Sequence, residues 1–205
     1  MTRLLTGNGC GLSLVIIISF FLGTIPAEAD AQFDSLAWIN RYQNHSVTSR
    51  DKVFDAILVN NERIVLTGVT ENDYTNFDIA SFSLDNNLDL RWEESYSGLY
   101  DYLSDDRAMD MTVDSSGSVL IAASSGLVLK RGPDGTLAWI KPFRTIDGTS
   151  FLVNYADIEA DTSGNCYLLF GGMVEYSPTG ENDTKTVLVK YDKGGNMLWY
   201  RKSDI

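Results

Sequence analysis

The octapeptide DKGGNMLW at residues 192–199 has two near copies earlier in the chain, GPDGTLAW at 132–139 and DNNLDLRW at 85–92. Each copy closes a segment of roughly fifty residues, so the chain is a tandem repeat. In such arrays each repeat is one supersecondary unit that buries its apolar faces against its neighbours. The repeat therefore indicates architecture far more strongly than activity.

Each segment contains four stretches with strand character. The first opens on Asp55, Asp110 or Asp157, and in the second and third segments it alternates apolar with polar residues. Such period-two alternation is typical of a half-buried strand. A nearly continuous apolar run follows in each segment, at 64–68, 119–123 and 166–172, which predicts an interior strand covered on both faces. A third strand and the strand that carries the tryptophan complete the segment.

Turn residues separate these strands. Asn, Asp, Ser and Gly cluster at 60–62, 114–117 and 161–165, where they favour hairpin reversals. No helical periodicity occurs after residue 31. We therefore predict an all-β fold, a partial β-propeller of about three four-stranded antiparallel blades at residues 51–98, 105–145 and 153–203. A β-sandwich is the structural alternative, but it explains the strands and not their recurrence.

Two motifs of the third segment resemble a known family. Residues 161–171 read D-x-x-G-N-x-Y-x-x-x-G, and residues 190–199 read K-Y-D-x-x-G-x-x-x-W. These motifs are similar to the bacterial secreted β-propeller repeats called SBBP repeats, and more distantly to quinoprotein-type propellers whose blades lock together through a docking tryptophan. The resemblance implies a secreted propeller and says little about function. The first segment departs from the pattern at residues 60–63, and the second has Lys130-Arg131 in place of Lys-Tyr.

The N-terminus has the layout of a cleavable secretory signal. Arg3 precedes an apolar run at residues 12–22, and Ala27, Ala29 and Ala31 follow it. We expect a signal-peptide helix in residues 1–31, cleavage after Ala29 or Ala31, and a repeat domain at 32–205. The predicted location is secreted, periplasmic or at the cell surface. An uncleaved membrane anchor is the alternative, although a span needs roughly 20 apolar residues.

The net charge bears on the possible partners, and the cysteine content bears on disulfide bonds. The net charge of −12 repels phosphate backbones and anionic lipid, which argues against nucleic-acid and membrane-surface partners. Cys166 is the only cysteine left after processing, so no intramolecular disulfide is expected. Because it lies in an apolar run, we interpret it as a small core residue.

Trp38 lies in a stretch, LAWINRY, that resembles the fourth strand of a blade without the other three. The last segment already has its own such strand, so the Trp38 strand has no evident sheet to join. Closed propellers have at least four blades. We therefore expect an N-terminal fragment of a longer propeller, with exposed sheet edges through which the chain could self-associate. An open three-blade stack with a capping strand is the alternative.

No catalytic, cofactor-binding or metal-binding residues are assigned from the sequence. His45 is the single histidine, which leaves no zinc set and no supported triad. Asp101, Asp105 and Asp106 offer oxygen ligands for calcium, but their spacing matches no calcium motif, so a solvated acidic loop is the simpler interpretation. The N-glycosylation patterns at Asn44 and Asn182 have meaning only in a eukaryotic secretory pathway.

Two features are candidates for binding. The tryptophans could stack on sugars, although their recurrence at one position favours packing between blades. The loop at residues 173–185, with Tyr176 and Pro178, is the best candidate for a surface that contacts a partner.

The leading hypothesis is a secreted, non-enzymatic propeller scaffold that binds protein or glycan ligands and needs no cofactor. The alternative is a fragment of a quinoprotein-type, PQQ-dependent dehydrogenase, suggested by the spacing of four between Gly135 and Trp139 and between Gly195 and Trp199. The chain is short for a ring that encloses a cofactor, and a thermal shift with pyrroloquinoline quinone plus calcium would test this alternative.

Overall fold

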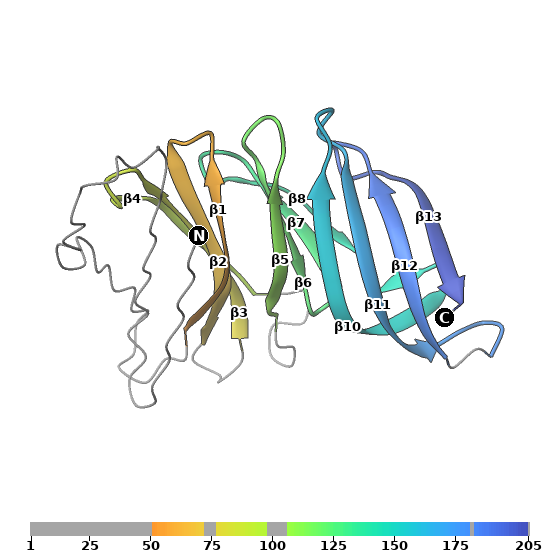
Figure 1. The fold of residues 1–205 in the computed structure, drawn as a ribbon. Coiled ribbons are helices and arrows are strands. Elements are labelled where there is room, and N and C mark those ends of the chain that lie inside the picture. The colour runs from red at the N-terminus through yellow and green to blue at the C-terminus, as the bar shows by residue number, and fades with distance from the viewer. Residues whose placement is uncertain (1–50, 72–76, 98–105, 181–182, 205) are drawn as a thin grey trace, which may run out of the picture. The chain divides into compact units, whose positions relative to one another are not determined.

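The computed structural model describes residues 51–71, 77–97, 106–180 and 183–204. Every regular element in these ranges is a β-strand, and the strands form three antiparallel sheets (Figure 1). The predicted all-β fold with three successive sheets is therefore confirmed, and the arrangement is propeller-like. A two-sheet sandwich does not describe three sheets.

The first sheet has the order β1-β2-β3-β4. Asn60 and Asn61 take φ angles of 51° and 55° in the tight turn between the first two strands, a left-handed conformation that asparagine tolerates. The strands are β1 (Lys52–Val59), β2 (Arg63–Glu71), β3 (Phe77–Asp85) and β4 (Leu90–Tyr96).

The second sheet repeats this topology with the order β5-β6-β7-β8. Its first turn is held by Asp114, whose Oδ1 accepts hydrogen bonds from the backbone N–H groups of Ser116 and Ser118, at 2.9 and 3.0 Å. The strands are β5 (Ala108–Val113), β6 (Val119–Ala123), β7 (Leu127–Arg131) and β8 (Leu137–Pro142).

The third sheet has five strands instead of the predicted four, in the order β13-β12-β11-β10-β9. The additional strand arises because Asp147 and Gly148, with φ angles of 53° and 72°, make a tight turn that pairs two residues with the start of β10. The sheet therefore begins well before residue 153. The strands are β9 (Thr145–Ile146), β10 (Thr149–Ala160), β11 (Cys166–Tyr176), β12 (Thr184–Tyr191) and β13 (Met197–Asp204).

Two apolar cores join the three sheets in chain order. One core lies between the first and second sheets and includes Val65, Ile121 and Leu129. The other lies between the second and third sheets and includes Leu120 and Phe170. Because successive side chains of a strand point to opposite faces, β6 sends Leu120 into one core and Ile121 into the other. Each such side chain contributes about 1.5–3 kcal/mol to folding.

The prediction of interior strands holds for β2 and β6 but is wrong for β11. All residues of β6 are buried, whereas β11 alternates between buried and exposed residues, with Leu169 38% and Met173 48% exposed. The reason is that β6 lies between two neighbouring sheets, and no described residue outside the third sheet packs over the Leu169 side of β11.

Several expectations concern residues outside the described ranges. These are the signal sequence at 1–31, the Trp38 strand, His45, Asp101, Asp105, Asn44 and Asn182. Within the described ranges, no helix is long and apolar enough to cross a membrane.

Candidate functional site

The residues with potential chemistry have structural roles in the described part of the chain. Cys166 is buried, and burial raises the pKa of its thiol to about 11, so it stays protonated at neutral pH. This agrees with its interpretation as a core residue. Asp106 is buried as well, and its backbone N–H donates to the Phe77 carbonyl at 2.7 Å. Within the described ranges, no three His, Cys, Asp or Glu side chains are grouped as a metal would need.

The aspartates of the turns accept hydrogen bonds from backbone N–H groups. Asp161 Oδ1 accepts hydrogen bonds from the N–H groups of Ser163 and Asn165, both at 2.9 Å, as Asp114 does in the second sheet. Burial opposes ionisation of Asp114, but the hydrogen bond from Lys130 and those from its own turn outweigh it and lower the pKa of the carboxyl. Lys130 Nζ lies 2.6 Å from Asp114 Oδ2.

Trp92, in the outermost strand of the first sheet, docks on the second sheet. Its indole Nε1 donates to the Pro133 carbonyl at 3.0 Å, and its ring covers Gly135, where a Cβ would lie only 2.8 Å from Cδ2 of the indole. Arg63 Nη1 donates to the same Pro133 carbonyl at 2.5 Å, and its Nη2 donates to the Gly117 carbonyl. An indole and a cation thus share one acceptor in the neighbouring turn.

Trp139 repeats this contact between the second and third sheets. Its Nε1 donates to the Lys193 carbonyl at 3.2 Å, and a Cβ at Gly195 would lie 2.9 Å from Cδ2 of the indole. Lys130 Nζ also approaches the Lys193 carbonyl, at 3.4 Å. The two described tryptophans that have a following sheet therefore serve packing between sheets, which was the favoured interpretation of their recurrence.

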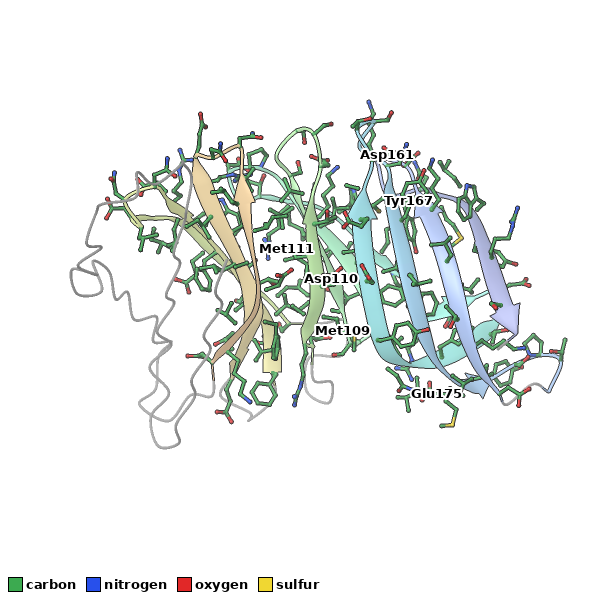
Figure 2. All side chains as sticks on the ribbon, viewed as in Figure 1. Met109, Asp110, Met111, Asp161, Tyr167 and Glu175 are labelled. Carbon is green, nitrogen blue, oxygen red and sulfur yellow. The ribbon has the colours of Figure 1, made fainter. Side chains whose placement is uncertain are left out.

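A pair of carboxylates, Asp110 and Asp157, lies where β5 of the second sheet meets β10 of the third sheet. Asp110 on β5 accepts a hydrogen bond from the Ile158 backbone N–H of β10 at 2.7 Å (Figure 2). Burial, and a hydrogen bond and charge repulsion from Asp157, raise the pKa of Asp110 to about 6. Beside them, Thr112 Oγ1 donates to Glu159 Oε2 at 3.2 Å. This cluster links the second and third sheets and contains one carboxyl, that of Asp110, whose pKa is raised.

The third sheet exposes one apolar face, which we call the distal face. It lies opposite the core shared with the second sheet, and strand register places its members together: Tyr167 pairs with Lys190, which pairs with Trp199, and Leu169 pairs with Leu188. Tyr155 lies across Gly171 on this face, with its hydroxyl 2.7 Å from Thr186 Oγ1. The large apolar and aromatic members are Leu152, Tyr155, Tyr167, Leu169, Met173, Leu188 and Trp199.

A group of hydrogen-bonded polar side chains lies at one end of the distal face. Tyr167 lies close to Asp161 at the end of the sheet where β11 begins, and Glu175 lies toward the opposite end (Figure 2). Lys190 Nζ donates to the Tyr167 hydroxyl at 2.6 Å and lies 3.8 Å from Asp161 Oδ2. The Tyr167 and Trp199 rings meet edge to face, with centroids 6.2 Å apart. This end presents an ordered cation beside an indole.

A shallow hollow opens along β13, next to the distal face. Its volume is about 470 Å³, and its lining residues are Asp147, Trp199, Tyr200, Arg201 and Lys202. A hydrogen bond with Asp147 raises the pKa of Tyr200, and the Arg201 guanidinium lies 5.7 Å from the centre of the Trp199 ring. The hollow was not foreseen from the sequence.

The predicted partner loop at 173–185 is shorter than expected. Residues 173–176 extend β11 and residues 184–185 begin β12, so the connection covers 177–183. Tyr176 is 63% exposed, and Ser177 and Thr179 bond each other through their hydroxyls at 2.8 Å. The strand ends of this segment add exposed surface next to the distal face.

Comparisons with known proteins add little to this description. No family model matches the chain, and no curated protein matches it. A solved structure of Drosophila plexin A in complex with semaphorin 1b is similar, with a TM-score of 0.31 and 8% identity. The match covers 75% of this chain and 41% of that one, so the chain spans less than half the length of that structure.

Proposed function

We propose that this chain is a secreted, non-catalytic β-propeller module of the SBBP-repeat kind, and that it binds a protein partner through the distal face. Its location outside the cytoplasm is part of this proposal and rests on the signal-like pattern at residues 1–31.

One observation carries the binding proposal. In the second sheet, Leu120, Ala122 and Val128 are each 0% exposed because the third sheet covers them. Strand register places Tyr167, Leu169 and Leu188 at the equivalent positions of the third sheet. The distal face thus has the composition of a sheet interface while Leu152, Tyr155, Leu169 and Met173 are 38–48% exposed. Contiguous exposed apolar surface of this kind marks interaction sites.

The chemistry of the face favours protein over other partners. Apolar and aromatic side chains rimmed by the charged groups Lys190, Arg201 and Glu175 form the pattern of a protein interface, with an apolar centre and a polar rim. Arg144 pairs with Glu175 at this rim, which keeps the carboxylate ordered.

Site-specific photocrosslinking in the native host tests the proposal. We would place p-benzoylphenylalanine at Leu169 or Met173, with the exposed Leu137 of β8 as the matched control position. Discrete protein adducts at 169 and 173, and none at 137, are expected. Adducts of equal yield at all three positions, or none at 169 and 173, would remove the proposal.

Glycan binding is the other outcome of interest. The hollow beside Trp199 combines an aromatic ring with charged groups, as sugar sites do. Glycan-array signals that disappear in Trp199→Ala, together with no protein adducts at 169, would assign the face to glycans instead.

A further inference from the structure

The two interfaces between sheets follow one rule of donors and acceptors. In each, the acceptor is the carbonyl six residues before the tryptophan of the following sheet, Pro133 or Lys193, and the glycine four residues before it lies under the incoming indole. The donors are the indole of the preceding sheet and a cation, Arg63 or Lys130. The rule predicts what a third interface of this kind must contain.

The distal face presents the donors of the second interface, an indole and a lysine, in the same register. Trp199 pairs with Lys190 across β13 and β12, as Trp139 pairs with Lys130 across β8 and β7. Lys190 is held by Tyr167 and Asp161, as Lys130 is held by Asp114. Within the described ranges, no group accepts a hydrogen bond from the Trp199 indole. A further sheet with a backbone carbonyl in the equivalent turn would supply the acceptor that the rule calls for.

The first sheet of another copy lacks the feature that such a sheet needs. Its equivalent turn has the same backbone bond, Leu88 N–H to the Asp85 carbonyl at 3.0 Å, as Gly135 N–H makes to the Gly132 carbonyl at 2.9 Å. Leu88 holds the left-handed conformation with φ 63°, where Gly135 has φ 87°. Leu88 thus puts a side chain where an incoming indole would lie.

We propose that the distal face docks a four-stranded sheet of this same repeat type whose turn carries glycine four residues before its tryptophan position, and that Leu88 prevents a second copy of this chain from supplying it. This inference rests on the proposed function and names the partner's chemistry: a free backbone carbonyl for Trp199 and Lys190, and a glycine to receive the ring.

An extended chain tests the inference. In the extended protein, residue 200 is followed directly by a second copy of residues 141–205. Because residue 200 is equivalent to residue 140, the added copy of the third sheet then follows Trp199 in the way that the natural third sheet follows Trp139. The matched control carries leucine in place of the glycine equivalent to Gly195, in the added copy only. Because the turn at Leu88 keeps its backbone bond with leucine, the control sheet is expected to fold, and circular dichroism checks that it does.

The measurement is hydrogen exchange of the Trp199 indole N–H in ¹⁵N spectra, assigned with Trp199→Phe. The glycine extension should slow this exchange about tenfold, as one new hydrogen bond implies, while the leucine extension leaves it as in the parent chain. Unchanged exchange with the glycine extension, or equal slowing with leucine, would overturn the inference.

The result is independent of the crosslinking experiment. Adducts at Leu169 together with no effect of the glycine extension would keep a protein-binding face and reject a repeat sheet as its partner. Slowed exchange of the Trp199 indole N–H without crosslinked adducts would show that the distal face can dock a sheet. The proposal that it binds a protein partner in the host would then be rejected.

Discussion

Gly135 shows how a single residue position decides whether two sheets can meet. A side chain there would collide with the Trp92 indole, and its φ of 87° disfavours any L-residue. Gly195 has the same role under Trp139. The spacing of four between glycine and tryptophan, visible in the sequence, is therefore a packing rule between neighbouring repeats.

Gly135→Ala should lower the free energy of unfolding by about 2–4 kcal/mol, since backbone strain adds to a clash with a ring that is fixed by a hydrogen bond. Gly180→Ala is the matched control, because Gly180 has a similar φ of 77° and nothing within 4 Å of a built Cβ. Urea unfolding followed by tryptophan fluorescence measures both. Equal losses in the two variants would show that the indole contact contributes nothing.

Asp110 makes stability depend on pH. Its pKa is about 6 in the folded protein and near 4 when unfolded, so the folded state binds the proton more tightly. The stabilisation that this provides is complete below about pH 4 and is lost as the pH rises through 6.

Asp110→Asn should flatten this slope between pH 4 and 7 and raise stability at pH 7, because the amide oxygen can still accept from Ile158 N–H without carrying charge beside Asp157. Unfolding midpoints across this pH range are the test. An unaltered slope in the variant would contradict the assignment.

At the scale of strands and turns, the sequence pattern predicted most of the fold. Asn60-Asn61 and the Asp-x-x-Gly turns were visible as reversals because only a few residue types tolerate their backbone angles. Strand β9 was missed, although the Asp147-Gly148 dipeptide is a recognised hairpin signal, because a two-residue strand carries no periodicity. The end of β11 was assigned to a loop because the connection after the apolar run is longer in the third segment than in the second, and the pairing of residues 173–176 with β10 is not visible in the sequence.

The distal face could not be predicted in the same way. Apolar runs in β6 and β11 look alike in sequence, and only the presence of a further sheet decides whether both faces are covered. The sequence does show leucine at position 88, where the other two repeats have glycine. Its meaning, that no indole can dock on this turn, follows only from the structure, in which an indole covers Gly135.

The Arg63 side chain on β2 donates hydrogen bonds to two backbone carbonyls of the second sheet, so removing it weakens the contact between β2 and that sheet. Arg63→Ala should destabilise the protein by about 2–3 kcal/mol, since it leaves the carbonyls of Gly117 and Pro133 with one donor fewer in a mostly buried place. Arg201→Ala, on exposed β13, should change stability by less than about 0.5 kcal/mol. Chemical unfolding compares the two, and similar losses would contradict the role given to Arg63.

Across residues 52–204, each sheet packs against its neighbours in the chain, so stability should be distributed as in a linear array. The second sheet contributes to both of these cores, so we expect its central strands to be among the most protected parts of the described chain.

Native-state hydrogen exchange should therefore find the slowest amides in β6 and β7 and faster exchange in β4 and β13. A uniform pattern over the three sheets, or the slowest amides in β13, would show that the array does not fold as successive packed units.

The α-proton chemical shifts of Gly135 and Gly195 test most directly whether an indole wedges each sheet against the next. Ring currents should move the Gly135 protons well upfield, and Trp92→Leu should return them to ordinary values, as Trp139→Leu should for Gly195. Ordinary shifts in the parent chain, or upfield shifts that survive these substitutions, would contradict the account.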